Sequence, residues 1–117
     1  MTRDTYTPED YAFAQAEFYT YRRTLADYVA RLSEAATLLR AHTDRVTVAG
    51  VGLDGRGGAP VIDGHGLPAA ADIQRTLVRY RGAYDRLRTT WDGLPPGERD
   101  GLRAPPPDLP TLTPAAG

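Results

Sequence analysis

An apolar seam with alternating spacings of three and four residues is the feature that most constrains how this chain folds. It runs over four heptads, from Tyr11 to Leu39. A repeat of this length predicts one long amphipathic helix that packs along another helix. The seam consists of Tyr11, Ala14, Phe18, Tyr21, Leu25, Tyr28, Leu32, Ala35 and Leu39.

The start of this helix is marked by the run Thr7-Pro8-Glu9-Asp10. A threonine hydroxyl can cap the first turn, and proline is tolerated at the first helical position because its missing N–H would be unpaired there anyway. The two carboxylates lie near the positive end of the helix dipole. We therefore expect a helix over residues 8–42.

A second seam with the same period indicates a second helix. It comprises Ile73, Leu77, Tyr80, Tyr84, Leu87, Trp91 and Leu94, and it predicts a helix over residues 69–92. Gly93 is expected to adopt the left-handed conformation of a helix cap, and the two prolines that follow it forbid continuation. Two seams of matching period predict a mainly α fold, built on a long antiparallel, coiled-coil-like helical hairpin.

The segment between the two helices has strand character. Residues 46–53 are rich in β-branched side chains, residues 54–58 are suited to a tight turn, and residues 59–63 form a returning strand, so a β-hairpin is predicted over 46–63. Residues 50–55 also spell G-x-G-x-x-G, the pattern of a dinucleotide-binding loop. That mechanism requires a helix directly after the glycines, and Pro60 lies where the helix would form, so a glycine-rich turn is favoured.

The C-terminal part of the chain is rich in proline. Seven of the ten prolines lie between Pro95 and Pro114. A short helical turn is expected over residues 94–102, followed by an extended or disordered tail over 104–117. The predicted organisation is thus a single domain over residues 1–103 followed by this tail.

The two predicted helices differ in length. If they pair from their shared loop, helix 69–92 reaches back only to about Tyr19 and places Trp91 near Tyr19 and Tyr21. The start of the first helix, apolar nearly all round, then needs another cover, either the tail or a second copy. We favour a homodimer, a four-helix assembly, because two helices rarely bury enough area alone. The predicted oligomer interface is Tyr11, Phe13, Phe18, Tyr19, Tyr21 and Leu25.

Composition excludes several kinds of chemistry. The chain has no cysteine and no lysine, and Ser33 is its only serine. Thiolate nucleophiles, disulfides, Schiff bases and phosphate-loop lysines are therefore ruled out. Ser33 has no histidine or aspartate spaced to activate it, so we predict no catalytic residue and no cofactor. His42 and His65 have no fixed ligand spacing to Asp44, Asp54 or Asp63, which favours structural roles over a metal site.

Charge is distributed unevenly, although the chain carries a net charge of only -1. The second predicted helix concentrates arginine on the flanks of its seam, and pairing with Glu17, Asp27 or Glu34 is favoured. The alternative is contact with the phosphates of a nucleic acid. The residues concerned are Arg75, Arg79, Arg81, Arg86 and Arg88, against a single acid, Asp85.

These patterns favour interaction over catalysis. The sequence has no secretory leader and no apolar run long enough to span a membrane, so a cytoplasmic protein is expected. We predict a non-enzymatic, homo-oligomeric interaction or assembly protein, a scaffold or adaptor, whose partners are itself and another protein of a bacterial or phage complex. The alternative is a nucleic-acid-associated or regulatory protein, and the third interpretation is a small enzyme with an oligomer-built site.

Overall fold

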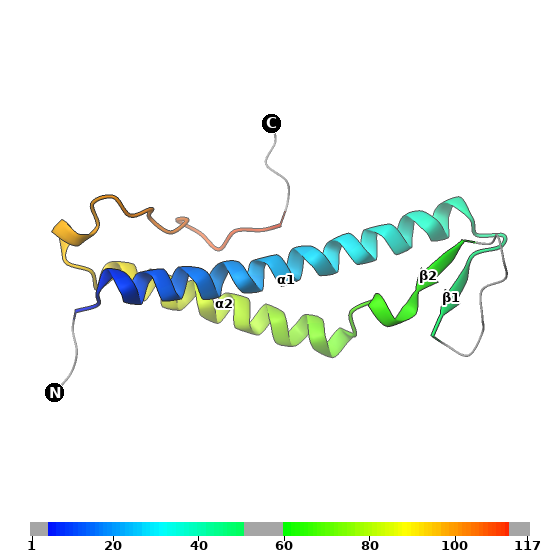
Figure 1. Ribbon diagram of the computed structural model, residues 1–117, viewed down its shortest axis with the longest axis horizontal. Helices are drawn as coiled ribbons and strands as arrows, with labels where there is room; N and C mark the ends of the chain where they lie inside the picture. Colours follow the sequence, from blue (N-terminus) through cyan, green and yellow to red (C-terminus); the bar gives the residue numbers. More distant parts are fainter. Residues whose placement is uncertain (1–4, 51–59, 113–117) are drawn as a thin grey trace. The chain divides into compact units, whose positions relative to one another are not determined.

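Two helices dominate the computed structural model, which describes residues 5–50 and 60–112 (Figure 1). The chain divides into two units: unit 1 contains the residues up to Leu25 and from Arg75 onwards, and unit 2 contains Ala26–Gln74. The elements are α1 (Pro8–Ala41), β1 (Thr47–Ala49), β2 (Val61–Asp63), a 3₁₀ turn (Gly64–Gly66), α2 (Ala70–Asp92) and a second 3₁₀ turn (Pro96–Glu98).

The first turn of α1 is capped from both directions. The Thr7 hydroxyl accepts a hydrogen bond from the Asp10 backbone N–H at 3.2 Å, and the Asp10 carboxylate accepts one from the Thr7 N–H at 2.9 Å. This is a reciprocal capping box with aspartate as its acidic member. The helix start predicted at Pro8 is confirmed, and α1 ends one residue before the predicted position 42.

Unit 1 is built on aromatic contacts between α1 and α2. The Phe18 ring stacks on Tyr80 with centroids 5.2 Å apart, and Tyr11 lies 5.2 Å from Trp91. Residue numbers rise along α1 as they fall along α2, so the antiparallel packing of the two helices is confirmed. Nine of the ten buried apolar residues in the described structure belong to this unit: Tyr11, Ala14, Phe18, Leu25, Tyr80, Ala83, Tyr84, Leu87 and Leu94.

The prediction that the start of α1 lacks a helical neighbour is wrong. Trp91, expected beside Tyr19 and Tyr21, packs on Tyr11, so α2 reaches almost to the beginning of α1. The prediction assumed that the helices pair from their shared loop. Residues 42–69 separate the helices and contain a small sheet, which frees α2 to begin well short of the end of α1.

Gly93 does not adopt the predicted left-handed conformation. Among the described glycines, only Gly50 and Gly101 have positive φ. The requirement at position 93 is space, because a Cβ there would lie 2.4 Å from Cδ2 of the Tyr6 ring. The Tyr6 N–H also donates a hydrogen bond to the Gly93 carbonyl at 3.1 Å. This glycine therefore lets the chain before α1 lie directly on the end of α2.

Unit 2 contains a two-stranded sheet that is parallel, whereas the sequence predicted an antiparallel β-hairpin. Thr47 pairs with Val61, and Ala49 pairs with Asp63. Parallel strands need a crossover longer than a tight turn, and residues 50–60 provide eleven residues between the strands. The β-branched residues identified the strands themselves, but they carry no information on strand direction. The turn predicted at 54–58 lies outside the described residues.

Candidate interaction surfaces

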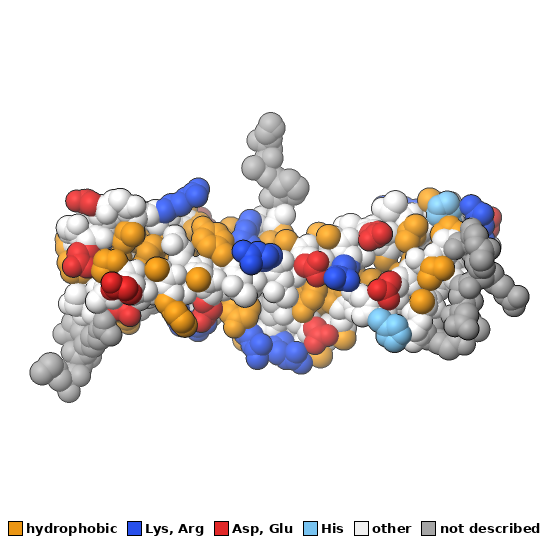
Figure 2. All heavy atoms as spheres, viewed as in Figure 1, with side chains coloured by type: hydrophobic (Ala, Val, Ile, Leu, Met, Phe, Trp, Pro, Cys, Tyr) orange, Lys and Arg blue, Asp and Glu red, His pale blue; other side chains and the backbone are white. Residues whose placement is uncertain are grey.

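An apolar stripe on α1 is exposed in unit 2. Val29, Leu32 and Leu39 are 47%, 43% and 52% exposed, and Ala36 lies between them at helical spacing. Leu32 and Leu39 continue the same heptad seam whose earlier members, Phe18 and Leu25, are buried in unit 1. We call Val29, Leu32, Ala36 and Leu39 the exposed stripe. Apolar side chains reach the surface at other places as well (Figure 2).

Unit 2 has little core of its own. Ile62 is the one buried apolar residue within its described part, and no α1 residue from Ala26 to Ala41 is buried. An amphipathic helix gains most of its stability by burying its apolar face. The exposed stripe is therefore where this unit could gain the most from an additional contact.

The predicted oligomer interface is divided by the structure. Tyr11, Phe18 and Leu25 are buried within the single chain, so they are not available to a second copy. Phe13 and Tyr19 remain exposed, by 74% and 41%, and Tyr21 is partly buried. The three buried residues belong to the heptad seam, whereas the exposed Phe13 and Tyr19 lie outside it.

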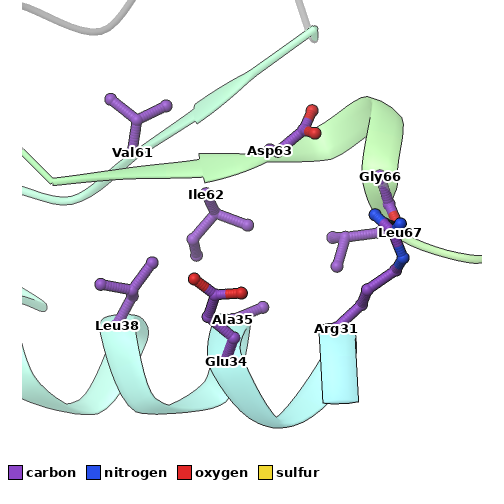
Figure 3. Close-up of a pocket in the computed structure, with 9 residues that line it drawn as sticks. All are labelled: Arg31, Glu34, Ala35, Leu38, Val61, Ile62, Asp63, Gly66 and Leu67. Carbon is purple, nitrogen blue, oxygen red and sulfur yellow. Dashed lines mark hydrogen bonds between the residues drawn. The ribbon is translucent and has the colours of Figure 1, made fainter. Parts of the chain in front are cut away.

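A small cavity in unit 2 lies between α1 and β2 (Figure 3). It encloses about 160 Å³, and the Ile62 side chain points into it from the strand. Arg31 crosses its end, donating to the Asp27 carboxylate at 2.8 Å and to the Gly66 carbonyl at 3.4 Å. The hydrogen bond to Asp27 raises the pKa of Arg31 above its ordinary value. Its described lining residues include the carboxylates of Glu34 and Asp63 but no hydroxyl, thiol or imidazole.

A second hollow, of about 340 Å³, lies beside Phe13 in unit 1. Its walls are mixed, with carboxylates of Asp10, Glu17 and Asp85 next to apolar and threonine side chains. Arg86 donates to the Glu17 carboxylate at its edge, from Nε at 2.8 Å, which neutralises part of this acidity. Phe13 thus lies in a hollow that it shares with another aromatic residue, Tyr6, and with Ala14.

The arginines of α2 are partly engaged within the chain. Arg86 binds Glu17, one of the three acids predicted as partners. Arg88 donates to the Tyr84 hydroxyl and to the Pro107 carbonyl, and Arg75 also has a partner. Arg79 and Arg81 are exposed. A nucleic-acid face built from all five arginines would first have to break these contacts, and phosphate binding remains an untested prediction.

The residues considered for a metal site do not converge in the described structure. Asp63 instead caps the 3₁₀ turn, because its carboxylate accepts from the His65 N–H at 3.1 Å. Within residues 5–50 and 60–112, no three His, Cys, Asp or Glu side chains form a cluster fit for a metal. Asp54 and most of the G-x-G-x-x-G run lie outside the described residues. Neither α1 nor α2 has a stretch apolar enough to cross a bilayer.

Tyrosine hydroxyls make a set of contacts that the sequence did not predict. Tyr11, Tyr80 and Tyr84 point their hydroxyls at backbone carbonyls of residues 103–110, the proline-rich part of the chain. A signal was present, since a buried tyrosine needs a hydrogen-bond partner and proline-rich segments offer carbonyls with few N–H groups. These contacts attach the described tail to unit 1.

Comparison of the chain with protein-family models, curated proteins and solved structures gave no match. We therefore infer function from the surfaces of the chain itself.

Proposed function

We propose that this chain is a non-enzymatic assembly protein that associates with a second copy of itself through the exposed stripe of unit 2. The observation that supports this most is the exposure of Leu32 and Leu39 on a seam of which four earlier members are buried, Tyr11, Ala14, Phe18 and Leu25. The exposed part of the seam still needs a helix to pack against, and α1 of a second copy can supply one. In this proposal the exposed stripe, rather than the start of α1, forms the contact between copies.

A second copy suits the stripe because the stripe is self-complementary. Two-fold symmetric dimers bring one surface patch against itself, so two antiparallel stripes can interdigitate their leucines. The small side chain of Ala36 between Leu32 and Leu39 allows the helix backbones to approach closely. The low burial within unit 2 adds a reason for the association, since dimerisation would give the α1 portion of this unit a buried face.

The free energy of this contact determines the protein concentration at which the dimer can be observed. Fully burying a Val or Leu side chain is worth about 1.5–3 kcal/mol, so six half-exposed side chains in a dimer offer about 5–9 kcal/mol. Association itself costs about 4–15 kcal/mol in lost freedom. Even with the smallest of these costs, the net gain is at most about 5 kcal/mol, so the dimer is weak and its dissociation constant should be about 0.2 mM.

The test is the molar mass of the full chain in solution, measured by sedimentation equilibrium from about 10 μM to about 1 mM. We expect a rise from 12.7 kDa towards twice that mass. The double variant Leu32→Glu with Leu39→Glu should remain monomeric throughout this range. A wild-type chain that stays at 12.7 kDa up to the highest concentration would contradict the proposal.

Two controls make the test specific to this surface. Val78→Glu changes another exposed aliphatic residue, 56% exposed on α2, and should leave the association unchanged. Phe13→Asp tests the start of α1, where the sequence had placed the interface. If Phe13→Asp abolishes association and the double leucine variant does not, the interface lies at the start of α1 and our assignment to unit 2 is wrong.

A further inference from the structure

The tail segment, residues 103–112, lies on unit 1 through hydrogen bonds to its backbone. The Tyr11 hydroxyl donates to the Arg103 carbonyl at 2.5 Å, Tyr84 donates to Pro106 at 2.6 Å, and Tyr80 donates to Pro110 at 2.9 Å. All three tyrosine residues are buried, with at most 8% of their surface exposed. Their hydroxyls are thus fixed donors on two packed helices.

Two of these donors are themselves held by arginine. Arg22 donates to the Tyr80 hydroxyl at 3.0 Å, and Arg88 donates to the Tyr84 hydroxyl at 3.1 Å. A hydroxyl that accepts from a cation is polarised and becomes a stronger donor to the next acceptor. The two tyrosines lie four residues apart on α2, and the carbonyls they bind lie four residues apart on the tail segment, in the opposite direction. Each Arg–Tyr pair therefore binds one backbone carbonyl, and the two carbonyls lie four residues apart on the tail segment.

The side chains of the tail segment differ in exposure. Pro107, Asp108 and Leu109 are exposed, whereas Pro105, Pro106, Pro110 and Leu112 are partly buried. Arg88 adds a further hydrogen bond to a backbone carbonyl, that of Pro107, at 2.8 Å. Proline removes the backbone N–H and favours an extended conformation, which leaves carbonyls free to accept from a partner. Recognition thus combines hydrogen bonds to an extended, proline-rich backbone with the partial burial of proline side chains.

We propose that this surface of unit 1 is a binding site for proline-rich extended segments of a partner protein, which the chain's own tail segment occupies as an intramolecular ligand. Recognition of proline-rich segments by aromatic residues that donate hydrogen bonds to carbonyls is a general mode of peptide binding. A tethered ligand has an effective concentration in the millimolar range, so a partner binds only by displacing it. The site lies in unit 1 and does not depend on the dimer proposed for unit 2.

The test measures binding of a fluorescently labelled peptide of residues 102–112 to the full chain. In one variant, Pro105, Pro106 and Pro107 are changed to glycine, which weakens the chain's own tail segment as a competitor because the free tail gains conformational freedom. We expect this variant to bind the peptide about tenfold more tightly than the unaltered chain does. Failure of the peptide to bind the variant would overturn the proposal.

The hydroxyls are tested in the same tail-weakened background. Tyr80→Phe with Tyr84→Phe keeps both rings and should weaken peptide binding about tenfold. Tyr19→Phe is the matched control, since it removes the hydroxyl of an exposed tyrosine, and should leave the affinity unchanged. Equal affinity in all three proteins would show that the hydroxyls do not recognise the peptide and would also overturn the proposal.

A second measurement keeps the proposal testable if the glycine variant fails to fold. The chain has no cysteine, so Leu109→Cys can be labelled at a single site with a fluorophore. Excess unlabelled peptide should displace the labelled tail segment and lower the fluorescence anisotropy, whereas a peptide with glycine at each proline should not. Unchanged anisotropy at saturating peptide would contradict a displaceable tail.

Discussion

The apolar seam of α1 runs through both units, but its burial differs between unit 1 and unit 2. In unit 1 the seam is covered by α2, and Phe18 and Leu25 are buried. In unit 2 the seam continues through Leu32 and Leu39, which are about half exposed. The difference teaches that a heptad pattern specifies a face that can be buried, while the partner that buries it depends on where the rest of the chain lies.

The largest expected effect comes from a pair of identical substitutions one heptad apart. Leu25→Ala should lower the free energy of unfolding of unit 1 by about 2–5 kcal/mol, because it opens a cavity at a residue that is 4% exposed. Leu32→Ala should change it by less than about 0.5 kcal/mol in dilute solution. Chemical denaturation followed by the fluorescence of Trp91, the only tryptophan, measures both. Equal losses for the two variants would remove the distinction between the units.

Local signals made most of the helical part of this fold predictable. The capping run at Thr7 and the prolines after Gly93 placed the helix ends to within one residue, because they act over a single turn. The helix register and the strand direction were not predictable. Both depend on the path of the chain between the two helices, residues 42–69. Tertiary packing determines that path, and no local sequence pattern specifies it.

The candidate surfaces were predictable only in part. The sequence identified the apolar character of α1, but it placed the contact between copies at residues such as Tyr11 and Phe18, which the chain buries itself. Charge and heptad position predicted that arginines of the second helix pair with Glu17, Asp27 or Glu34, and Arg86 binds Glu17. The tyrosine contacts with the tail segment escaped because they join residues up to 92 positions apart and use backbone carbonyls, which every sequence has.

Alkaline pH should weaken unit 1 through Tyr11. Burial raises the pKa of this hydroxyl above its ordinary value, and the neighbouring Tyr19 adds to the shift. Because the folded-state pKa is the higher one, the stabilising contribution is complete below about pH 10 and is lost as the pH rises through the folded-state value. Tyrosinate absorbance and Trp91 fluorescence should therefore change together. Tyr11→Phe should move the alkaline loss of structure to higher pH, and an unchanged midpoint would contradict this role.

A smaller effect separates the two ends of α1, one in each unit. Thr7→Ala removes the capping hydroxyl and should lower stability by about 1 kcal/mol. Thr43→Ala removes an exposed hydroxyl that donates to the Leu39 carbonyl, and should lower stability by less than about 0.5 kcal/mol. Thermal unfolding followed by helical circular dichroism gives both values. A larger loss at Thr43 would mean that the end of α1 in unit 2 is better packed than its exposure indicates.

Amide hydrogen exchange along α1, measured at low and high protein concentration, tests most directly whether a second copy covers the seam that unit 2 leaves exposed. Residues 11–25 should exchange slowly and at the same rate at both concentrations, because the chain itself buries Tyr11, Phe18 and Leu25. Residues 29–39 should become more protected as the concentration rises, and Leu32→Glu with Leu39→Glu should abolish this gain. Protection of residues 29–39 that does not depend on concentration, or a gain confined to residues 11–25, would contradict the account.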